Sequence, residues 1–570
     1  MRVRRLRAVS APATLRPTRI RLRPWQSEAL DSFTTKKGRD FLAVATPGAG
    51  KTTFALTAAV QDLAEQPGRR LVVVAPTQHL KHQWADAALR FGLHLEPEWS
   101  ARDGALPVDM HGIVTTYQQV ATSARALAPL SRDAFVIFDE IHHAADDRAW
   151  GSSVLLAFQD AAQRLSLSGT PFRSDTSAIP FVQYHLDEAR ADYEYGYGEA
   201  LADGGVVRPV YFPRINGFME WTAPDGSVVE ATFEDELPRE LANQRLRTAL
   251  SLEGQWLPTV LDQAHERLMD LRRNHAEAGG LIIATDQTHA NEIARLMANR
   301  HGTTPVVAVS DDPEASRKIA AFGNSDQPWI VAVRMVSEGV DLPRLRVAVF
   351  ATTTTTELFF RQAVGRVVRW TRGVPRQKSY FFLPDDARLR HFAATLAEQR
   401  RHSLRKRADA EDTGLDPEPE LDPVDEGDDE QMSLFAVIGA VSLGEAGGGG
   451  GDVDEGVFGD DPDGELHDTR DEHGVELVLL PPPLPGGGVP RLAAEGDESG
   501  APGPSLRQRK IVLRDANADL ARELVRSTGW SHPKVNAELN RLSGITRISE
   551  ATLEQLERRL AVGRKWLRNN

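Results

Sequence analysis

One segment near the N-terminus indicates the fold of the whole first half: Phe41-Leu42-Ala43-Val44-Ala45-Thr46-Pro47-Gly48-Ala49-Gly50-Lys51-Thr52. A short apolar run, typical of a buried strand, leads into a loop of small residues, and a helix-like segment follows. This order predicts a phosphate-binding loop, because the backbone N–H groups of the loop and the helix N-terminus can both face a phosphate. Lys51 would then reach the β- and γ-phosphates, and Thr52 would offer its hydroxyl to Mg²⁺.

Composition divides the 570 residues into basic parts and one strongly acidic segment. The formal net charge is −14, but residues 408–504 alone hold 27 Asp and Glu against two Arg, which leaves the remainder at +11. A basic folded part indicates a nucleic-acid partner. The chain has no cysteine, which excludes disulfides, thiolate zinc sites and Cys-ligated iron–sulfur clusters.

The ends and the hydropathy indicate where the protein works. No apolar run is long enough to span a membrane, so no membrane partner is expected. The first twenty residues are basic and lack acids, which faintly resembles a transit peptide; a flexible basic lead is the favoured interpretation. We therefore expect a cytoplasmic protein, encoded by a bacterium or a phage.

Polar residues at expected strand ends form the next set of candidates. Gln26, in the segment Leu22–Leu30 that precedes the loop, has the donor and the acceptor needed to read an adenine edge. Thr77 and Thr116 follow two apolar runs, and ligands gather at the carboxyl ends of parallel strands. Both hydroxyls could hold a nucleic-acid backbone, and ordinary loop capping is an equally good explanation for either.

A second strong signal is the segment Phe135-Val136-Ile137-Phe138-Asp139-Glu140-Ile141-His142-His143. Four apolar residues, typical of a buried strand, are followed directly by two acids, so both acids are expected at the end of that strand. Asp139 can hold Mg²⁺, while Glu140 can orient and deprotonate the attacking water. His142 would couple this site to a neighbouring domain, and the hydroxyls of Ser168 and Thr170 after a later strand would sense the nucleotide. A solvated acidic turn is the alternative, and the preceding apolar strand argues against it.

These segments, in this order and spacing, resemble the first RecA-like domain of superfamily 2 DEAD/DEAH-box helicases. The Leu22–Gln26 form is closer to the branch of type III restriction motors and DEAH-type repair helicases than to classical DEAD-box RNA helicases. The resemblance implies binding of ATP and Mg²⁺ and action on nucleic acid, with DNA favoured. It also implies a set of nucleotide-binding residues in the first domain: Gln26, Gly48, Gly50, Lys51, Thr52 and Thr53.

The second half of the chain continues the resemblance. Residues 334–343 are similar to helicase motif V, in which Ser337 and Gly339 would face nucleic acid and nucleotide, and Asp341 the ribose. Residues 360–369 match motif VI, which is Q-x-x-G-R-x-x-R. On a helix its polar residues would share one face. Their roles follow from the motif: Gln362 binds nucleotide, and Arg366 and Arg369 act as arginine fingers.

The remaining chain is predicted from composition and periodicity. Residues 218–233 read as a β-hairpin that covers a sheet or contacts DNA. Residues 408–505 are too acidic and rich in Gly and Pro to fold alone. Within them, Gln431, Leu434 and Phe435 resemble the peptide with which bacterial replication proteins bind the sliding clamp; a stray strand is the alternative. Residues 506–570 predict three short basic helices, either a DNA-binding module or a docking bundle.

The expected fold is α/β with two tandem RecA-like P-loop domains, an acidic disordered linker and a small C-terminal helical domain. The expected boundaries are a basic lead at 1–20, domain 1 at 21–205, a connecting segment at 206–260, domain 2 at 261–407, the linker at 408–505 and the helical module at 506–570. The expected function is an ATP-dependent helicase or translocase. The alternatives are the motor subunit of a restriction or anti-phage complex, and an ATP-gated nucleic-acid-binding remodeller that does not translocate.

Overall fold

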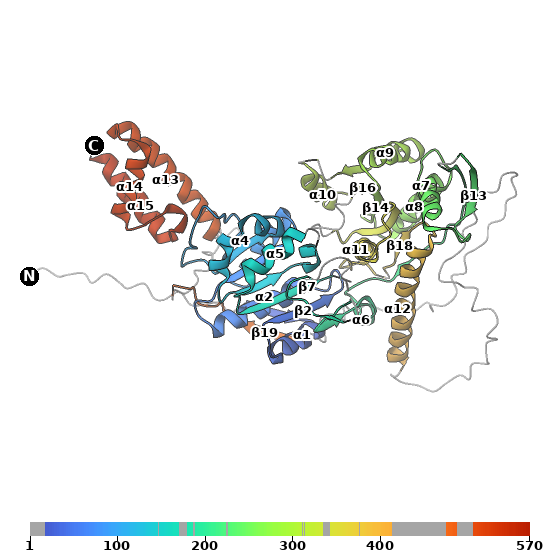
Figure 1. Cartoon of the computed structure of the whole chain (residues 1–570), viewed down its shortest axis with the longest axis horizontal. Helices are drawn as coiled ribbons and strands as arrows, with labels where there is room; N and C mark the ends of the chain where they lie inside the picture. The colour runs from blue at the N-terminus through green and yellow to red at the C-terminus, as the bar shows by residue number, and fades with distance from the viewer. Residues whose placement is uncertain are drawn as a thin grey trace, which may run out of the picture.

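The computed structural model describes residues 18–145, 148–169, 179–185, 188–223, 226–309, 312, 314–333, 342–375, 377–412, 475–486 and 506–569. These residues form two parallel α/β sheets with their helices and a separate three-helix bundle (Figure 1). The predicted fold class of two tandem RecA-like domains followed by a small helical domain is confirmed. Within the described residues, no helix is both long and apolar enough to cross a membrane.

Domain 1 is built on a seven-stranded parallel sheet in the order β10-β2-β7-β6-β3-β5-β4. Its strands are β2 (Asp40–Ala45), β3 (Leu71–Ala75), β4 (Leu95–Glu96), β5 (Gly112–Thr116), β6 (Phe135–Phe138), β7 (Gln163–Ser168) and β10 (Tyr193–Tyr195). Its helices are α1 (Pro24–Thr35), α2 (Lys51–Glu65), α3 (Gln78–Leu89), α4 (Tyr117–Ser131), the 3₁₀ helix η1 (Ile141–Ala145), α5 (Arg148–Phe158) and α6 (Tyr197–Ala202). A small hairpin, β8 (Tyr184–His185) and β9 (Glu188–Ala189), completes the domain. Because the strands are parallel, the loops after β2, β6 and β7 meet at one edge.

Domain 2 has a six-stranded parallel sheet in the order β11-β18-β17-β14-β16-β15. Its strands are β11 (Val210–Tyr211), β14 (Gly279–Ala284), β15 (Val306–Ala308), β16 (Trp329–Val333), β17 (Leu345–Ala351) and β18 (Ser379–Phe382). Its helices are α7 (Arg239–Ala249), α8 (Trp256–Asn274), α9 (Gln287–His301), α10 (Ala315–Gly323), α11 (Glu357–Val367) and α12 (Ala387–Asp412). The predicted hairpin is present as β12 (Phe218–Thr222) and β13 (Val228–Thr232). Met219 and Phe233 are buried in the same core cluster as Trp256, so the hairpin covers the domain core.

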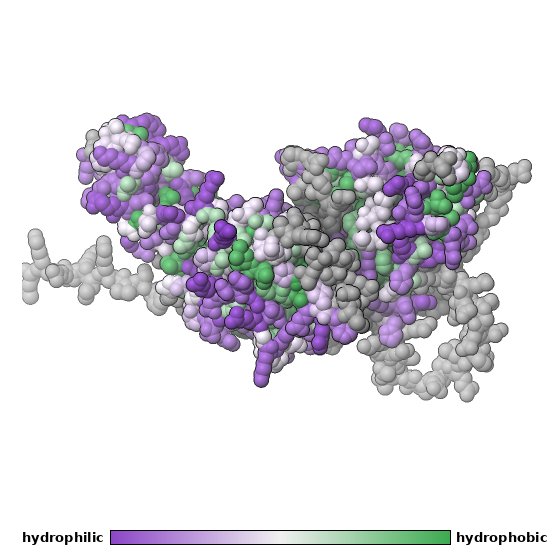
Figure 2. Space-filling model, in the orientation of Figure 1, coloured by the Kyte–Doolittle hydropathy of each residue, from purple (hydrophilic) through white to green (hydrophobic). Residues whose placement is uncertain are grey.

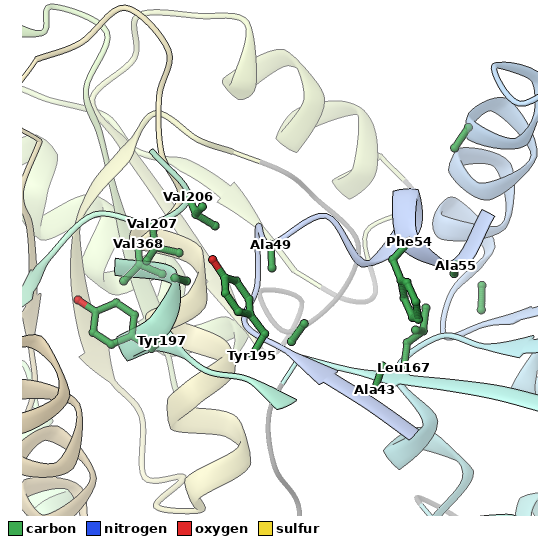
Figure 3. Packing of buried hydrophobic residues seen from close by; sticks show 14 of the residues in the cluster. Ala43, Ala49, Phe54, Ala55, Leu167, Tyr195, Tyr197, Val206, Val207 and Val368 are labelled. Atoms are coloured by element: carbon green, nitrogen blue, oxygen red, sulfur yellow. The ribbon is translucent and has the colours of Figure 1, made fainter. Parts of the chain in front are cut away.

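The two domains share one hydrophobic cluster around the chain that connects them. Val206 and Val207 follow α6 and pack with Val368 of domain 2, close to Tyr195 at the end of β10 (Figure 3). Val207 also forms an isolated antiparallel bridge with Arg369. This contact brings the end of α11 toward the loop that contains Ala49, which belongs to the same cluster.

Several predicted boundaries need correction. The predicted connecting segment 206–260 is part of domain 2, because β11 pairs with β18 in its sheet and both Met219 and Trp256 are buried in its core. Helix α12 runs to Asp412, past the predicted end of domain 2 at residue 407.

The predicted flexible lead extends to residue 20, but β1 (Thr18–Leu22) pairs antiparallel with β19 (Val475–Leu479), which lies inside the predicted linker. One face of this pair packs on domain 1: Leu22 and Leu479 are buried, and Ile20 and Leu477 pack beside them, whereas Val475 and Val478 are exposed. The average composition of residues 408–505 hides this short apolar run. Beyond β19, the carbonyl of Pro482 lies 3.2 Å from Nε2 of His111.

The C-terminal bundle contains α13 (Leu506–Thr528), α14 (His532–Ser543), the 3₁₀ helix η4 (Ile548–Glu550) and α15 (Leu553–Arg568), which confirms the three predicted helices. It has its own small core, formed by Leu520, Ala521, Leu524, Val535, Leu539 and Leu560. The bundle docks on domain 1 through Lys510, whose Nζ lies 2.5 Å from Oδ1 of Asp109. The other oxygen of Asp109 accepts a hydrogen bond from the amide of Leu553 at 2.9 Å.

Candidate active site between the two domains

The loop between β2 and α2 has the backbone geometry of a phosphate cradle. Gly48 and Gly50 adopt φ values of +84° and +94°, in the left-handed region that favours glycine. Lys51 is the first residue of α2, and Thr52 and Thr53 continue the same turn. The Nζ of Lys51 lies 3.1 Å from the carbonyl oxygen of Ala45 and 3.2 Å from Oε1 of Glu140. The lysine therefore already lies beside the acidic strand end, at the place where phosphate oxygens would meet it.

Residues before α1 hold this loop from outside. Arg23 donates to the carbonyl of Ala49 at 2.6 Å, and the indole of Trp25 donates to the same oxygen at 3.1 Å. The amide of Gln26 donates to the carbonyl of Gly50 at 2.9 Å, and its Oε1 accepts from the backbone of Arg23. The sequence predicts an adenine contact for Gln26. Its amide keeps one further donor and one further acceptor position, so the loop contact and an adenine contact are chemically compatible.

The acids after β6 occupy two different environments. Asp139 is buried and accepts a hydrogen bond from the indole of Trp84 at 2.8 Å. Burial and the neighbouring Glu140 raise the pKa of Asp139. Burial also works to raise the pKa of Glu140, but Lys51, His142 and the backbone N–H of Gly169 outweigh it and lower that pKa. Glu140 is therefore ionised at neutral pH.

The backbone at Glu140 supports a functional role for this residue. Its φ is +46°, which is uncommon for a residue other than glycine. The amide of Gly169, after β7, donates to Oε2 of Glu140 at 2.8 Å. Strained backbone held by a specific hydrogen bond is typical of active sites. The result is a carboxylate fixed between two strand ends.

The residues at this edge fit a nucleotide-bound Mg²⁺. Asp139 is a buried carboxylate whose pKa is raised, so a nearby cation would offset an unfavourable charge. Thr52 supplies a hydroxyl from the first turn of α2. In the described part of the chain, no cluster of three or more His, Asp or Glu could hold a metal alone.

His142 connects this acidic end to domain 2. Its Nδ1 lies 3.6 Å from Oε2 of Glu140 and 3.4 Å from Oγ of the buried Ser168. Its Nε2 lies 3.1 Å from Nε2 of Gln362 on α11. The sequence predicts a nucleotide contact for Gln362, and the structure places its amide against this histidine. A single imidazole thus lies between Glu140 and the second domain.

α11 packs directly on the phosphate-binding loop. A Cβ placed on Gly365 would lie 2.5 Å from Cγ of Pro47, so only glycine permits this approach. A Cβ on Gly48 would lie 3.5 Å from Cγ of Arg369. Arg366 is on the last turn of α11. The predicted arginine segment is therefore beside the phosphate-binding loop.

The prediction that Gln362, Arg366 and Arg369 share one helix face is wrong for Arg369. α11 ends at Val367, and Arg369 lies in the bridge with Val207. The reason is tertiary: the segment that connects the domains pairs with the chain after α11 and ends the helix.

Arg208 is a residue that the sequence reasoning missed. It is fully buried, and its guanidinium donates to the carbonyls of Pro343 at 2.7 Å, Leu345 at 3.3 Å, and Arg369. Burial lowers its pKa well below the usual value. Arg208 thereby fixes the backbone of the predicted arginine finger, and no sequence motif marks it. Trp84, which fixes Asp139, is equally unmarked.

Two predicted nucleic-acid contacts act as helix caps. The hydroxyl of Thr77 accepts from the amide of Leu80 at 3.3 Å, and that of Thr116 accepts from the amide of Gln119 at 3.2 Å. Thr116 is also buried. Both residues therefore have a capping role, but they cap the helices α3 and α4 and not loops.

Several predicted residues lie outside the described part of the chain. They are Thr170 after β7; Ser337, Gly339 and Asp341 of motif V; and Gln431, Leu434 and Phe435 of the clamp-like peptide. Their roles, including binding to a bacterial sliding clamp, stay predictions.

Comparison with known proteins agrees with this architecture. Residues 19–173 match the family described as type III restriction enzyme, res subunit, and residues 263–371 match the helicase conserved C-terminal domain. The Mycobacterium tuberculosis protein MT2985 is 38% identical over 564 residues, which cover 95% of this chain and 92% of that protein. The Mycobacterium leprae protein ML1624 is 38% identical over 566 residues, covering 95% and 93%. The DNA 3'-5' translocase XPB2 of Sulfurisphaera tokodaii is 26% identical over 394 residues, covering 63% and 81%.

The two family matches lie in tandem and coincide with the two parallel sheets. The phosphate-binding loop of the first match and helix α11 of the second are in contact. The chain belongs to the superfamily 2 helicases.

Proposed function

We propose that this protein is an ATP-dependent translocase on nucleic acid, with DNA as the favoured substrate. One observation carries the proposal: His142 lies between Glu140 of domain 1 and Gln362 of domain 2. A change in the contacts of Glu140 on hydrolysis can reach the second domain through His142. Such a connection is what a motor needs to convert hydrolysis into domain movement.

The hydrolytic roles follow from the charges at the site. Lys51, at the start of α2, offers its ammonium to the phosphate oxygens. Glu140 is ionised and can accept a proton from the attacking water. Asp139 and Thr52 would hold Mg²⁺, which neutralises charge on the phosphates when it is bound.

The second domain supplies the arginines. Arg369 lies against the loop at Gly48, and Arg366 is one turn earlier on the same packed segment. Guanidinium groups suit the charge that spreads over the γ-phosphate oxygens in the transition state. Because the loop and the arginines belong to different domains, bound ATP favours closure and hydrolysis releases it.

The preference for DNA rests on two observations. One relative is named as a DNA translocase, and the family matched by domain 1 is named for restriction enzymes. The same family match favours a second candidate, the motor subunit of a restriction complex. In that case we expect a partner subunit to cleave the DNA.

Triplex displacement tests translocation most simply. A motor that moves along duplex DNA removes a third strand in an ATP-dependent way, even without unwinding the duplex. Gln362→Ala should reduce displacement more than it reduces ATP binding, and Gln327→Ala, an exposed glutamine of domain 2, is the matched control. ATP hydrolysis without displacement or unwinding would favour the remodeller that does not translocate.

A further inference from the structure

The positive charges of the C-terminal bundle fall into groups that differ in what they contact. Residues 506–570 contain 14 Lys and Arg against seven Asp and Glu. Three cations face acids of domain 1: Arg507, Lys510 and Arg514. Five pair with carboxylates of the bundle itself: Arg509, Arg522, Arg541, Arg547 and Arg558. Arg559 is buried among asparagine side chains.

The remaining five cations all lie at one end of the bundle. They are Arg526 near the end of α13, Lys534 in the first turn of α14, and Arg564, Lys565 and Arg568 in the last turns of α15; all are exposed. Among the described carboxylates, none forms an ion pair with any of these five. Charge is thus concentrated and unneutralised at this place alone in the bundle.

This end is the one directed away from domain 1. α13 and α15 both begin at the docking contact, since Lys510 and Leu553 meet Asp109 there. Both helices therefore carry their final residues outward. Figure 1 shows the bundle projecting from domain 1 on the side away from domain 2, with the C-terminus at its outer end. Figure 2 shows a largely hydrophilic surface over the bundle.

An aromatic pair occupies the same outer end. Trp530, between α13 and α14, keeps 36% of its surface exposed. Trp566 lies 5.5 Å from it, centroid to centroid, with the ring planes at 67°. The Nζ of Lys534 lies 4.0 Å from the centroid of the Trp530 ring. An exposed indole among five cations combines the two groups that single-stranded nucleic acids bind.

We propose that the outer end of the bundle, formed by residues 526–534 and 564–568, is a second nucleic-acid site that binds single strands. The cations neutralise phosphates, and Trp530 stacks on a base. Lys534 is exposed, so its ammonium can move from the ring to a phosphate as a base takes its place. A duplex keeps its bases stacked inside, which is why a single strand is favoured.

The proposal goes beyond the motor function, because this end of the bundle contains none of the residues assigned to ATP. It rests on the proposed function in one respect only, namely that the partner of the protein is a nucleic acid. The site would hold a strand outside the two motor domains, and the dock at Asp109 would fix its position relative to domain 1.

The test measures strand binding by the full chain without nucleotide, so that ATP-driven closure contributes nothing. The probes are labelled oligothymidylate and oligouridylate of about 20 nucleotides, longer than the site of a typical small domain. A duplex of equal length is included. Fluorescence anisotropy gives the affinity between about 50 mM and about 200 mM salt.

Two triple variants with the same loss of charge are compared. One is Lys534→Gln, Lys565→Gln and Arg568→Gln; the control is Arg509→Gln, Arg541→Gln and Arg558→Gln, whose arginines are paired within the bundle. The first should lose at least about tenfold in affinity for single strands, with a salt dependence lower by about two in the log–log slope. The control should lose little. Equal losses in both, or none in either, would overturn the proposal.

Trp530 separates stacking from charge. Trp530→Ala should lower the affinity for single strands by about fivefold or more, and Trp530→Phe should keep most of the parent's affinity. Equal affinity of the alanine variant and the parent would overturn the stacking role. DNA and RNA probes distinguish the source of the strand. Stimulation of ATP hydrolysis is measured on the same preparations: its absence in the parent counts against the motor function, whereas unchanged binding by the variants counts against this site alone.

Discussion

Replacement of Asp109 by asparagine should release the C-terminal bundle from domain 1. Lys510 is 1% exposed and lies 2.5 Å from the carboxylate, which also accepts the amide of Leu553. Asparagine can still accept that amide, but it cannot neutralise the buried ammonium. Removal of one partner of a buried ion pair costs roughly 3–5 kcal/mol. At about 1.4 kcal/mol per tenfold, the docking equilibrium should fall by roughly 10²-fold to several thousandfold.

The other docking charges cannot replace this pair. Arg507 and Arg514 approach Glu96 at 3.9 Å and 3.8 Å, and such partly exposed pairs contribute at most about 1 kcal/mol each. The bundle keeps its own hydrophobic core, so it should stay folded when released.

The chain has no cysteine, so the docking can be followed by energy transfer between two introduced labels. Cysteines at the exposed positions of Ala101 and Ala561 would place one label on each side of the contact. Asp109→Asn should lower transfer, and a second change, Lys510→Met, should restore much of it by removing the unpaired charge. Asp86→Asn, the same change at an exposed acid of α3, is the control. Unchanged transfer in Asp109→Asn would show that the buried ion pair does not hold the bundle on domain 1.

The remaining predictions concern the active site and a buried histidine pair. Glu140→Gln should keep ATP affinity and lose turnover; single-turnover hydrolysis at the parent rate would remove Glu140 from the mechanism. Arg366→Ala and Arg369→Ala should each lower turnover on the order of 10³-fold with little change in ATP binding, and unchanged rates in both would place the finger elsewhere. Burial lowers the pKa of His94 and of His111 to about 4. The unfolded chain therefore binds protons from about pH 6.5, so domain 1 should lose roughly 3 kcal/mol per histidine as the pH falls toward 4. Urea unfolding at several pH values should show a shallower loss for His111→Gln, and an identical loss would contradict the assignment.

The parts of the fold that could be predicted from sequence are those encoded by local patterns. Two such patterns each predict a local structure from about ten residues. One is the apolar strand that leads into the glycines and Lys51, and the other is the apolar strand that leads into Asp139 and Glu140. Parallel pairing then brings both strand ends to one edge of a sheet. That edge is where the structure has the contact between Lys51 and Glu140.

The parts that could not be predicted depend on contacts between distant segments. Arg208 donates a hydrogen bond to the backbone carbonyl of Arg369, which lies 161 residues later in the sequence. Strand β19 pairs with β1, although both domains lie between them in the sequence. The end of α11 is decided by the bridge to Val207, because nothing in the local sequence stops the helix at Val367. A composition average over the acidic segment likewise gave no sign of a strand within it.

The rate of ATP hydrolysis of the full chain, alone and with single-stranded DNA, duplex DNA or RNA, is the decisive measurement for an ATP-driven motor on nucleic acid. Lys51→Ala is measured beside the parent. The side chain of Lys51 contacts Glu140 at the site and is not part of the hydrophobic core, so its removal should leave the fold unchanged. We expect turnover that nucleic acid stimulates, most strongly DNA, and that disappears in the variant. Turnover that no nucleic acid changes, or equal turnover in parent and variant, would contradict the central claim.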